Sequence, residues 1–288
     1  MKKMVIDIDK VFEFYNIDDK YKDRCYECIN NINANEKFKN SFDKIYEILY
    51  LKDFNKVKEL WNIKDINELF TMNIDPFVTN IMIIIGYPIH IYNMNKYKLD
   101  NNQIELHKKR VKECFENDLI IRNSDGVRIS QMLWATYFIR MKIIEVGRLQ
   151  YDFIGIENKT PIVKIHIPKG SKLEIDLVND SIEKSKIELK RYFDIDKCKY
   201  ICNSWLLSNQ VYEIIDKDSN IAKFRDLFDI KDGENCISDI LNFVYGLNEC
   251  DDYNLLSEET SIQRKIKKEL ISGKIFYLGL GVLRGVDF

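Results

Sequence analysis

The sequence predicts an α+β protein, in which a helical N-terminal domain precedes a domain with a mixed, partly antiparallel sheet flanked by helices. Up to about residue 128, apolar residues recur at intervals of three and four, which is the spacing of one buried helix face. From Gly147 onward, segments that alternate strictly between polar and apolar residues are interspersed with helical segments, and such alternation is typical of half-buried strands. The 288 residues, 45% of them hydrophobic, are enough for two domains.

The N-terminal domain is expected to cover residues 1–128. Asp75 and Pro76 are typical of a helix start, because Asp caps free amide groups and Pro fits the first turn. The turn-forming run Asn123-Ser124-Asp125-Gly126 marks the end of the domain. Helical periodicity is found at 38–49, 57–61, 76–85 and 103–119.

The second domain is expected to cover residues 129–288 and to begin with a helix from about 129 to 145. Its first two strands form a hairpin around Asn158 to Pro161 and must therefore be antiparallel, whereas helical crossovers favour parallel neighbours later in the sheet. The predicted strands are 148–153, 163–167, 199–205, 237–245 and 274–283. The predicted helices are 176–193, 208–216, 221–228 and 262–270, and Gly273 is placed to end the last one.

Composition excludes several classes of function. Lys and Arg number 44 against 46 Asp and Glu, and this balance gives no basic surface to attract nucleic acid or anionic lipid. The sequence shows neither a secretory signal nor an apolar run long enough to span a bilayer. With an odd number of cysteines, seven, reduced thiols and a cytoplasmic location are expected.

Five segments in order resemble the signature blocks of a bacterial acyltransferase family that combines a helical N-terminal domain with a GNAT-like C-terminal domain. The resemblance covers nearly the whole chain. The segments are Val146-Gly147-Arg148-Leu149-Gln150-Tyr151, His166-Ile167-Pro168-Lys169-Gly170, Cys202-Asn203-Ser204-Trp205-Leu206-Leu207, Ser219-Asn220-Ile221-Ala222-Lys223-Phe224 and Thr260-Ser261-Ile262-Gln263-Arg264.

The resemblance implies an N-acyltransferase, in which the amine of a small molecule or peptide attacks the thioester of acetyl-CoA or another acyl-CoA directly. It further implies that the acyl-CoA lies where two neighbouring central strands separate, with its pyrophosphate on backbone amides of a following loop and helix start. By position, the predicted strand ending at Trp205 and the segment after it provide this site. The residues expected to bind the cofactor are Trp205, Leu206, Leu207, Ser208, Ser219 and Asn220.

His166 and Ser204 are the candidate catalytic residues. A histidine on the polar face of a strand can accept a proton from an attacking amine, and Ser204 at a strand end can act as a nucleophile or a hydrogen-bond donor. Each also has a purely structural interpretation, in which His166 stabilises the hairpin and Ser204 caps the strand end. Ser219 and Asn220 likewise fit a helix cap.

Two alternatives remain open at this stage. Leu206 to Gln210 contains no glycine and departs from the Arg/Gln-x-x-Gly-x-Gly/Ala loop of the fold, which favours a non-catalytic binding or scaffold protein. A hydrolase using Cys202 or Ser204 is the more distant alternative. No metal is expected, because Cys25-x-x-Cys28 has no second ligand pair. The sequence also contains no GxxxxGK[ST], GxGxxG, HExxH or GxSxG motif.

Overall fold

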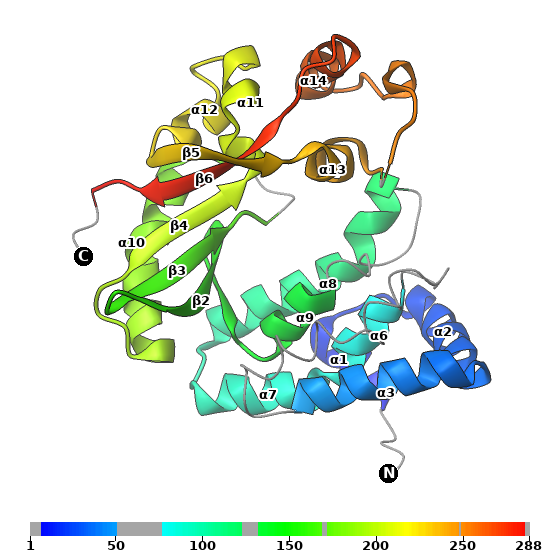
Figure 1. Ribbon diagram of the computed structural model, residues 1–288. Coiled ribbons are helices and arrows are strands. Elements are labelled where there is room, and N and C mark those ends of the chain that lie inside the picture. Colours follow the sequence, from blue (N-terminus) through cyan, green and yellow to red (C-terminus); the bar gives the residue numbers. More distant parts are fainter. Residues whose placement is uncertain (1–6, 51–76, 123–131, 169–171, 248, 286–288) are drawn as a thin grey trace. The chain divides into compact units, whose positions relative to one another are not determined.

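The structure is a computed structural model that describes residues 7–50, 77–122, 132–168, 172–247 and 249–285. It divides into two compact units, Met1–Ile143 and Ile144–Phe288. Figure 1 shows helices alone in the first unit and a sheet with helices in the second. The fold class expected from the sequence is thus confirmed. The expected boundary between residues 128 and 129 lies outside the described residues and stays a prediction.

The first unit is built of helices whose apolar faces share one core. The run from Val78 to Ile85 is buried at every position, so this helix is the centre of the unit. Phe12 and Phe77 each pack edge to face against Phe115 in the same core, with ring centroids about 6 Å apart. The described helices are α1 (Ile8–Tyr15), α2 (Lys22–Ala34), α3 (Glu36–Tyr50), α6 (Val78–Ile85), α7 (Tyr87–Lys96), α8 (Asn101–Arg122) and α9 (Met132–Ile139).

A polar chain runs through this apolar core. The hydroxyl of Tyr15 lies 2.8 Å from Nδ1 of His90, and Nε2 of His90 lies 3.2 Å from Nδ1 of His107. All three residues are buried. Burial, followed by the neighbouring His107, lowers the pKa of His90, and burial raises the pKa of Tyr15. Both groups therefore stay neutral in the folded protein at neutral pH.

The described part of the second unit contains a six-stranded mixed sheet in the order β1-β2-β3-β4-β6-β5. β2 and β3 form the expected antiparallel hairpin, and both residues of its turn, Asn158 and Lys159, have positive φ, as tight hairpin turns require. β4 is parallel to β3, whereas β6 is antiparallel to both β4 and β5. The strands are β1 (Ile143–Val146), β2 (Leu149–Glu157), β3 (Thr160–His166), β4 (Lys199–Ser204), β5 (Phe228–Asn235) and β6 (Tyr277–Leu283).

Helix α10 (Ile175–Phe193) crosses from β3 to β4 and covers one face of the sheet (Figure 1). The buried Ser181 hydroxyl accepts a hydrogen bond from the backbone N–H of Leu149 and donates to the carbonyl of Val146. One turn further along, the Ser185 hydroxyl lies 2.8 Å from the hydroxyl of Tyr200 on β4. Two buried serines therefore fix the helix to the β1–β2 turn and to β4.

The smaller helices follow β4 in sequence. Thr260 begins α14 with a complete capping box, since its hydroxyl and the Gln263 amide each bond to the backbone of the other residue. Gly273 follows the helix with φ of +84°, as expected of a helix stop. The remaining elements are η3 (Trp205–Leu207), α11 (Asn209–Ile214), α12 (Asn220–Arg225), α13 (Ile237–Ile240), a π-helical turn (Leu241–Tyr245), η5 (Tyr253–Leu255) and α14 (Ser261–Ile271).

Two predicted elements are wrong in detail. The helix expected to continue to residue 145 ends at Ile139, and β1 follows it. The strand expected at 237–245 is instead the helical segment of α13 and the π-helical turn, while the preceding residues form β5. None of the described helices is long and apolar enough to span a bilayer.

Acid should destabilise the first unit through His90. Because the folded-state pKa lies below the unfolded value of about 6.5, the unfolded chain binds more protons as the pH falls below about 6.5. Each further pH unit should then remove up to about 1.4 kcal/mol of stability. Urea unfolding between neutral pH and mild acid measures this loss.

The His90→Gln variant provides the control, because an amide retains hydrogen-bonding capacity towards Tyr15 and His107 but does not titrate. Its unfolding midpoint should change less with pH than that of the wild type. Equal pH dependence in the two proteins would contradict the assignment.

Candidate functional site

The candidate site begins where two parallel strands separate. β3 and β4 pair at Ile162 with Lys199, Val163 with Tyr200, and Lys164 with Ile201. In the described residues their pairing ends there, although β3 continues to His166 and β4 to Ser204. Figure 1 shows the two strands side by side and pointing the same way. The unpaired edges beyond Lys164 and Ile201 can bond an extended ligand that carries amide groups.

His166 is the last residue of β3, and it pairs with Gln150 on β2. The adjacent pair, Tyr151 and Ile165, is on the α10 side of the sheet, because Tyr151 contacts Ser181 of that helix. Since successive strand residues point to opposite faces, His166 lies on the face away from α10.

The imidazole of His166 has an unused nitrogen. Its Nε2 is buried and makes no hydrogen bond within the described residues. The nearest carboxylate oxygen paired with it, Oδ2 of Asp152, is 3.7 Å away, which is too long for a hydrogen bond. Because buried polar atoms are almost always bonded, this nitrogen is a candidate to contact a ligand.

Ser204 is at the end of β4 and faces the other side of the sheet. It pairs with Gly279 and shares the face of Tyr200, which bonds to α10. Its hydroxyl accepts a hydrogen bond from the backbone N–H of Leu206 and so caps η3. The structure therefore places the two predicted catalytic residues on opposite faces of the sheet and does not bring them together.

The segment expected to hold the cofactor after β4 is the tight turn η3. The N–H groups of Leu206 and Ser208 donate within this turn, to Ser204 and to the carbonyl of Trp205. Leu207 is fully buried against β6. The hydroxyl of Ser208, also buried, donates to Gln210. Two of the amides expected to receive a pyrophosphate are thus already hydrogen-bonded within the turn. The assignment of Trp205 to Ser208 to cofactor binding stays a prediction.

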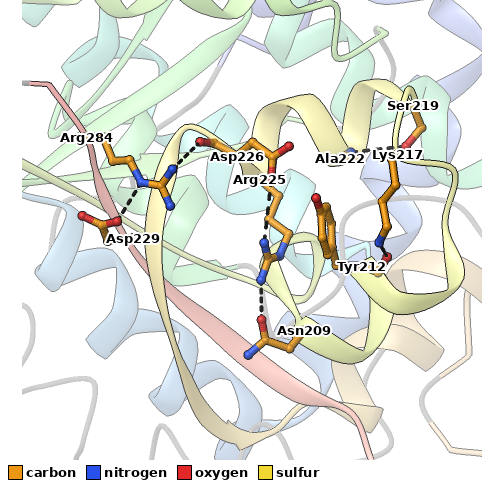
Figure 2. Close-up of polar contacts among 9 residues, drawn as sticks. All are labelled: Asn209, Tyr212, Lys217, Ser219, Ala222, Arg225, Asp226, Asp229 and Arg284. Atoms are coloured by element: carbon orange, nitrogen blue, oxygen red, sulfur yellow. Dashed lines mark hydrogen bonds and ion pairs between the residues drawn. The ribbon is translucent and has the colours of Figure 1, made fainter.

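Ser219 and Asn220 begin α12 on the α10 side of the sheet (Figure 1). The Ser219 hydroxyl accepts from the N–H of Ala222, which is the cap that the sequence also allowed. Figure 2 shows Arg225 of this helix lying beside the ring of Tyr212 and reaching Asn209. These contacts join α12 to α11.

Arg284, directly after β6, continues this polar network. Its Nε donates to Asp229 at 2.7 Å and its Nη1 donates to the carbonyl of Asp226 (Figure 2). The polar contacts of Arg225 and Arg284 thus join small helices to the edge of the sheet. The assignment of Ser219 and Asn220 to cofactor binding also stays a prediction.

Two carboxylates near the opening were not singled out by sequence analysis. Asp152 lies beside His166. It falls within a predicted strand, and the pattern of that strand does not indicate a role for its carboxylate. Asp239 is in α13, where burial and then Glu234 raise the pKa of its carboxyl, while Lys164 lowers it. Asp239 is thus within electrostatic reach of Lys164, the last paired residue of β3. It was missed because its segment was predicted to be a strand.

Helix α10 offers a second feature suited to an anion. Eight residues separate its first residue from the end of β3, and it follows the carboxyl end of that strand. Its N-cap residue, Glu174, makes no side-chain hydrogen bond to the first turn. Amide groups at the start of a 19-residue helix favour a phosphate group. In the described ranges, no group of three or more His, Cys, Asp or Glu side chains is arranged to hold a metal ion.

Comparisons with known proteins agree with this architecture. Residues 143–283 match the family model described as "GNAT-like C-terminal domain". A search of curated proteins gave no match.

Among solved structures, the chain is similar to an acyltransferase in complex with decanoyl-CoA, with a TM-score of 0.64 and 21% identity over 72% of this chain and 66% of that protein. It is also similar to an acyltransferase in complex with decanoyl-CoA and teicoplanin, with a TM-score of 0.62 and 20% identity over 70% of this chain and 64% of that protein. The chain thus spans slightly less than two thirds of each of these proteins, and at this identity the likeness shows a shared fold.

Gly279→Ala should disturb η3 more than Gly281→Ala. A Cβ at Gly279 would lie 2.4 Å from the main-chain carbonyl of Leu207, which cannot move without shifting the turn. At Gly281 it would meet the end of the Leu207 side chain at 2.8 Å, which can rotate. Overpacking of this kind costs about 1–3 kcal/mol, with Gly279→Ala at the upper end.

Thermal or urea unfolding of the two variants measures the difference. Equal destabilisation would show that the backbone contact of Leu207 is not the limiting one.

Proposed function

Residues 143–283 form a GNAT-like C-terminal domain, and from that premise we propose that the protein is an acyl-CoA-dependent N-acyltransferase. The observation that carries the proposal is the separation of the parallel strands β3 and β4 beyond Lys164 and Ile201. This opening presents unpaired strand edges in the middle of a sheet, where backbone groups are otherwise bonded.

The opening suits the amide-containing arm of an acyl-CoA. Cys202 to Ser204 keep β6 as a partner on one side, so that the side facing β3 is free to pair with pantetheine amides in the manner of an added strand. The pyrophosphate would then lie at the wide end of the opening. We favour the first turn of α10 for it, because the N–H groups of Leu206 and Ser208 are used within η3.

Bound acyl-CoA supplies a thioester, whose C–S bond breaks as a C–N bond to the amine forms and the CoA thiol is released. Only the neutral amine can attack the thioester carbon, so the protein must accept a proton that the amine nitrogen loses. His166 is the proposed base, because no residue in the described part of the chain bonds to its Nε2 and a carboxylate, Asp152, lies 3.7 Å away to stabilise the imidazolium. Ser204 is proposed to support the fold of η3, since its hydroxyl caps that turn.

The acceptor is proposed to be the amine of a small molecule or a peptide. One solved relative holds decanoyl-CoA and teicoplanin together, so a protein of this fold accommodates a second organic molecule beside the acyl-CoA. His166 lies on the sheet face away from α10. We therefore propose that the amine approaches from that face.

Isothermal titration with acetyl-CoA and longer acyl-CoAs tests the proposal directly. Binding is expected, followed by release of free thiol when an amine is added.

Asn203→Trp should abolish binding, because Asn203 is exposed on the part of β4 that does not pair with β3, and a bulky side chain there would fill the opening. Lys184→Trp, on the outer surface of α10, is the matched control. The absence of any binding at millimolar acyl-CoA would instead favour the non-catalytic scaffold alternative.

His166→Asn should lower kcat by about 100-fold or more, as loss of a general base does, and should leave the dissociation constant of acyl-CoA unchanged. Asp152→Asn should have a smaller effect in the same direction, because Asp152 acts through His166. Wild-type kcat in His166→Asn would remove this residue from the chemistry.

A further inference from the structure

A groove crosses the sheet face that lies away from α10. It encloses about 590 Å³ and is formed by residues of β2 to β6, all within the second unit. Apolar side chains form most of its floor, and three of them are unusually exposed: Ile154 at 51%, Ile156 at 69% and Leu280 at 37%. Exposed aliphatic groups clustered in a concave surface are typical of a binding site.

A β-bulge shapes one wall of the groove. The register of β2 against β3 shifts between Phe153 and Gly155, so Ile154 is an extra residue in β2. Ile154 and Gly155 both line the groove as a result, and Gly155 adds no side chain to fill it. The bulge thus widens the groove at the end far from His166.

The groove is continuous with the opening between β3 and β4. Ile201 is the last residue of β4 that pairs with β3, and Asn203 lies beyond it, where β4 no longer pairs with β3. Both residues line the groove, as does Ile162 in the paired part of β3. The groove therefore starts where the strands separate and extends back over their paired segments, away from the wide end of the opening.

The charges at the groove indicate what it holds. Lys199 and Lys231 lie at its rim together with Glu157 and Asp229, so that neither sign of charge predominates. An uncharged aliphatic chain fits such a site better than an anionic group does. The volume is that of a small-molecule pocket and is too small for a stable protein interface.

We propose that this groove binds the acyl chain of a medium- or long-chain acyl-CoA. The inference rests on the proposed function: a thioester at the narrow end of the opening, near Ile201, would direct its acyl chain along the floor formed by Ile162, Ile154 and Leu280. The protein should therefore select acyl groups by length, and the acetyl group, which is too short to reach the floor, should be a poor donor.

Titration of the full chain with acetyl-CoA, hexanoyl-CoA and decanoyl-CoA tests the inference. Affinity should rise with length, up to about fourfold for each methylene that the groove buries. In the double variant Ile154→Gln/Leu280→Gln, the ratio of decanoyl-CoA to acetyl-CoA affinity should fall about tenfold, because two apolar contacts are lost. Both side chains are substantially exposed, which limits the cost to folding.

Ile187→Gln provides the matched control. Ile187 is 69% exposed on α10, the other side of the sheet, and its replacement should leave the affinity ratio unchanged.

The outcomes separate this inference from the proposed function. Equal affinity for acetyl-CoA and decanoyl-CoA, or an unchanged ratio in the double variant, would overturn the groove assignment and leave acyl-CoA binding intact. A higher KM for the amine acceptor in the double variant, with the acyl-CoA ratio unchanged, would also overturn it and assign the groove to the acceptor. Failure of every acyl-CoA to bind would overturn both proposals.

Discussion

The attachment of α10 to the sheet by Ser181 and Ser185 is the constraint on which the second unit depends. The Ser181 hydroxyl satisfies two backbone groups at the β1–β2 turn and lies 3.0 Å from the hydroxyl of Tyr151. Burial raises the pKa of Tyr151 and Tyr200, so both phenols stay neutral and can donate hydrogen bonds. Because an unsatisfied buried group costs about 1–3 kcal/mol, the helix has one favourable position. That position fixes the crossover between β3 and β4, and hence the point where these strands separate.

Sequence pattern predicted the elements whose burial is one-sided. The stripe of Val178, Ile182 and Leu189 predicted α10 almost to the residue, and β2, β3 and β4 followed from alternation. Pattern analysis failed where the spacing of apolar residues does not reflect the position of the segment in the fold. Ile237 to Tyr245 is an apolar run whose period fits helix or strand, and it was assigned to the wrong class. β5 has few apolar residues, because it lies at the edge of the sheet. Only pairing with β6 makes it a strand.

The individual site residues stay a prediction. The sequence directed attention to His166 and to Ser204 in the strand expected to end at Trp205, and these two residues lie at the ends of β3 and β4, the strands that separate. It placed them together in one site, however, whereas register assigns them to opposite faces. Which residues of a strand share a face can be counted from the sequence. Which of the two faces lies against α10 cannot, because it is decided by the hydrogen bond between Tyr200 and α10, which is a tertiary contact. The apolar groove depends on five separate strands and a bulge, and no local pattern contains it.

The edge strand β5 has a consequence for association between molecules. It pairs with β6 on one side, and its other side ends the sheet (Figure 1). Asp229, Lys231, Asp232 and Glu234 are exposed along it, and its register shifts between Asp232 and Asn235. Charges and irregular pairing on a terminal strand oppose the addition of a foreign strand. The composition that hid β5 from pattern analysis thus protects this edge of the sheet against intermolecular growth, whereas the opening between β3 and β4 keeps amide groups that an extended molecule can pair with.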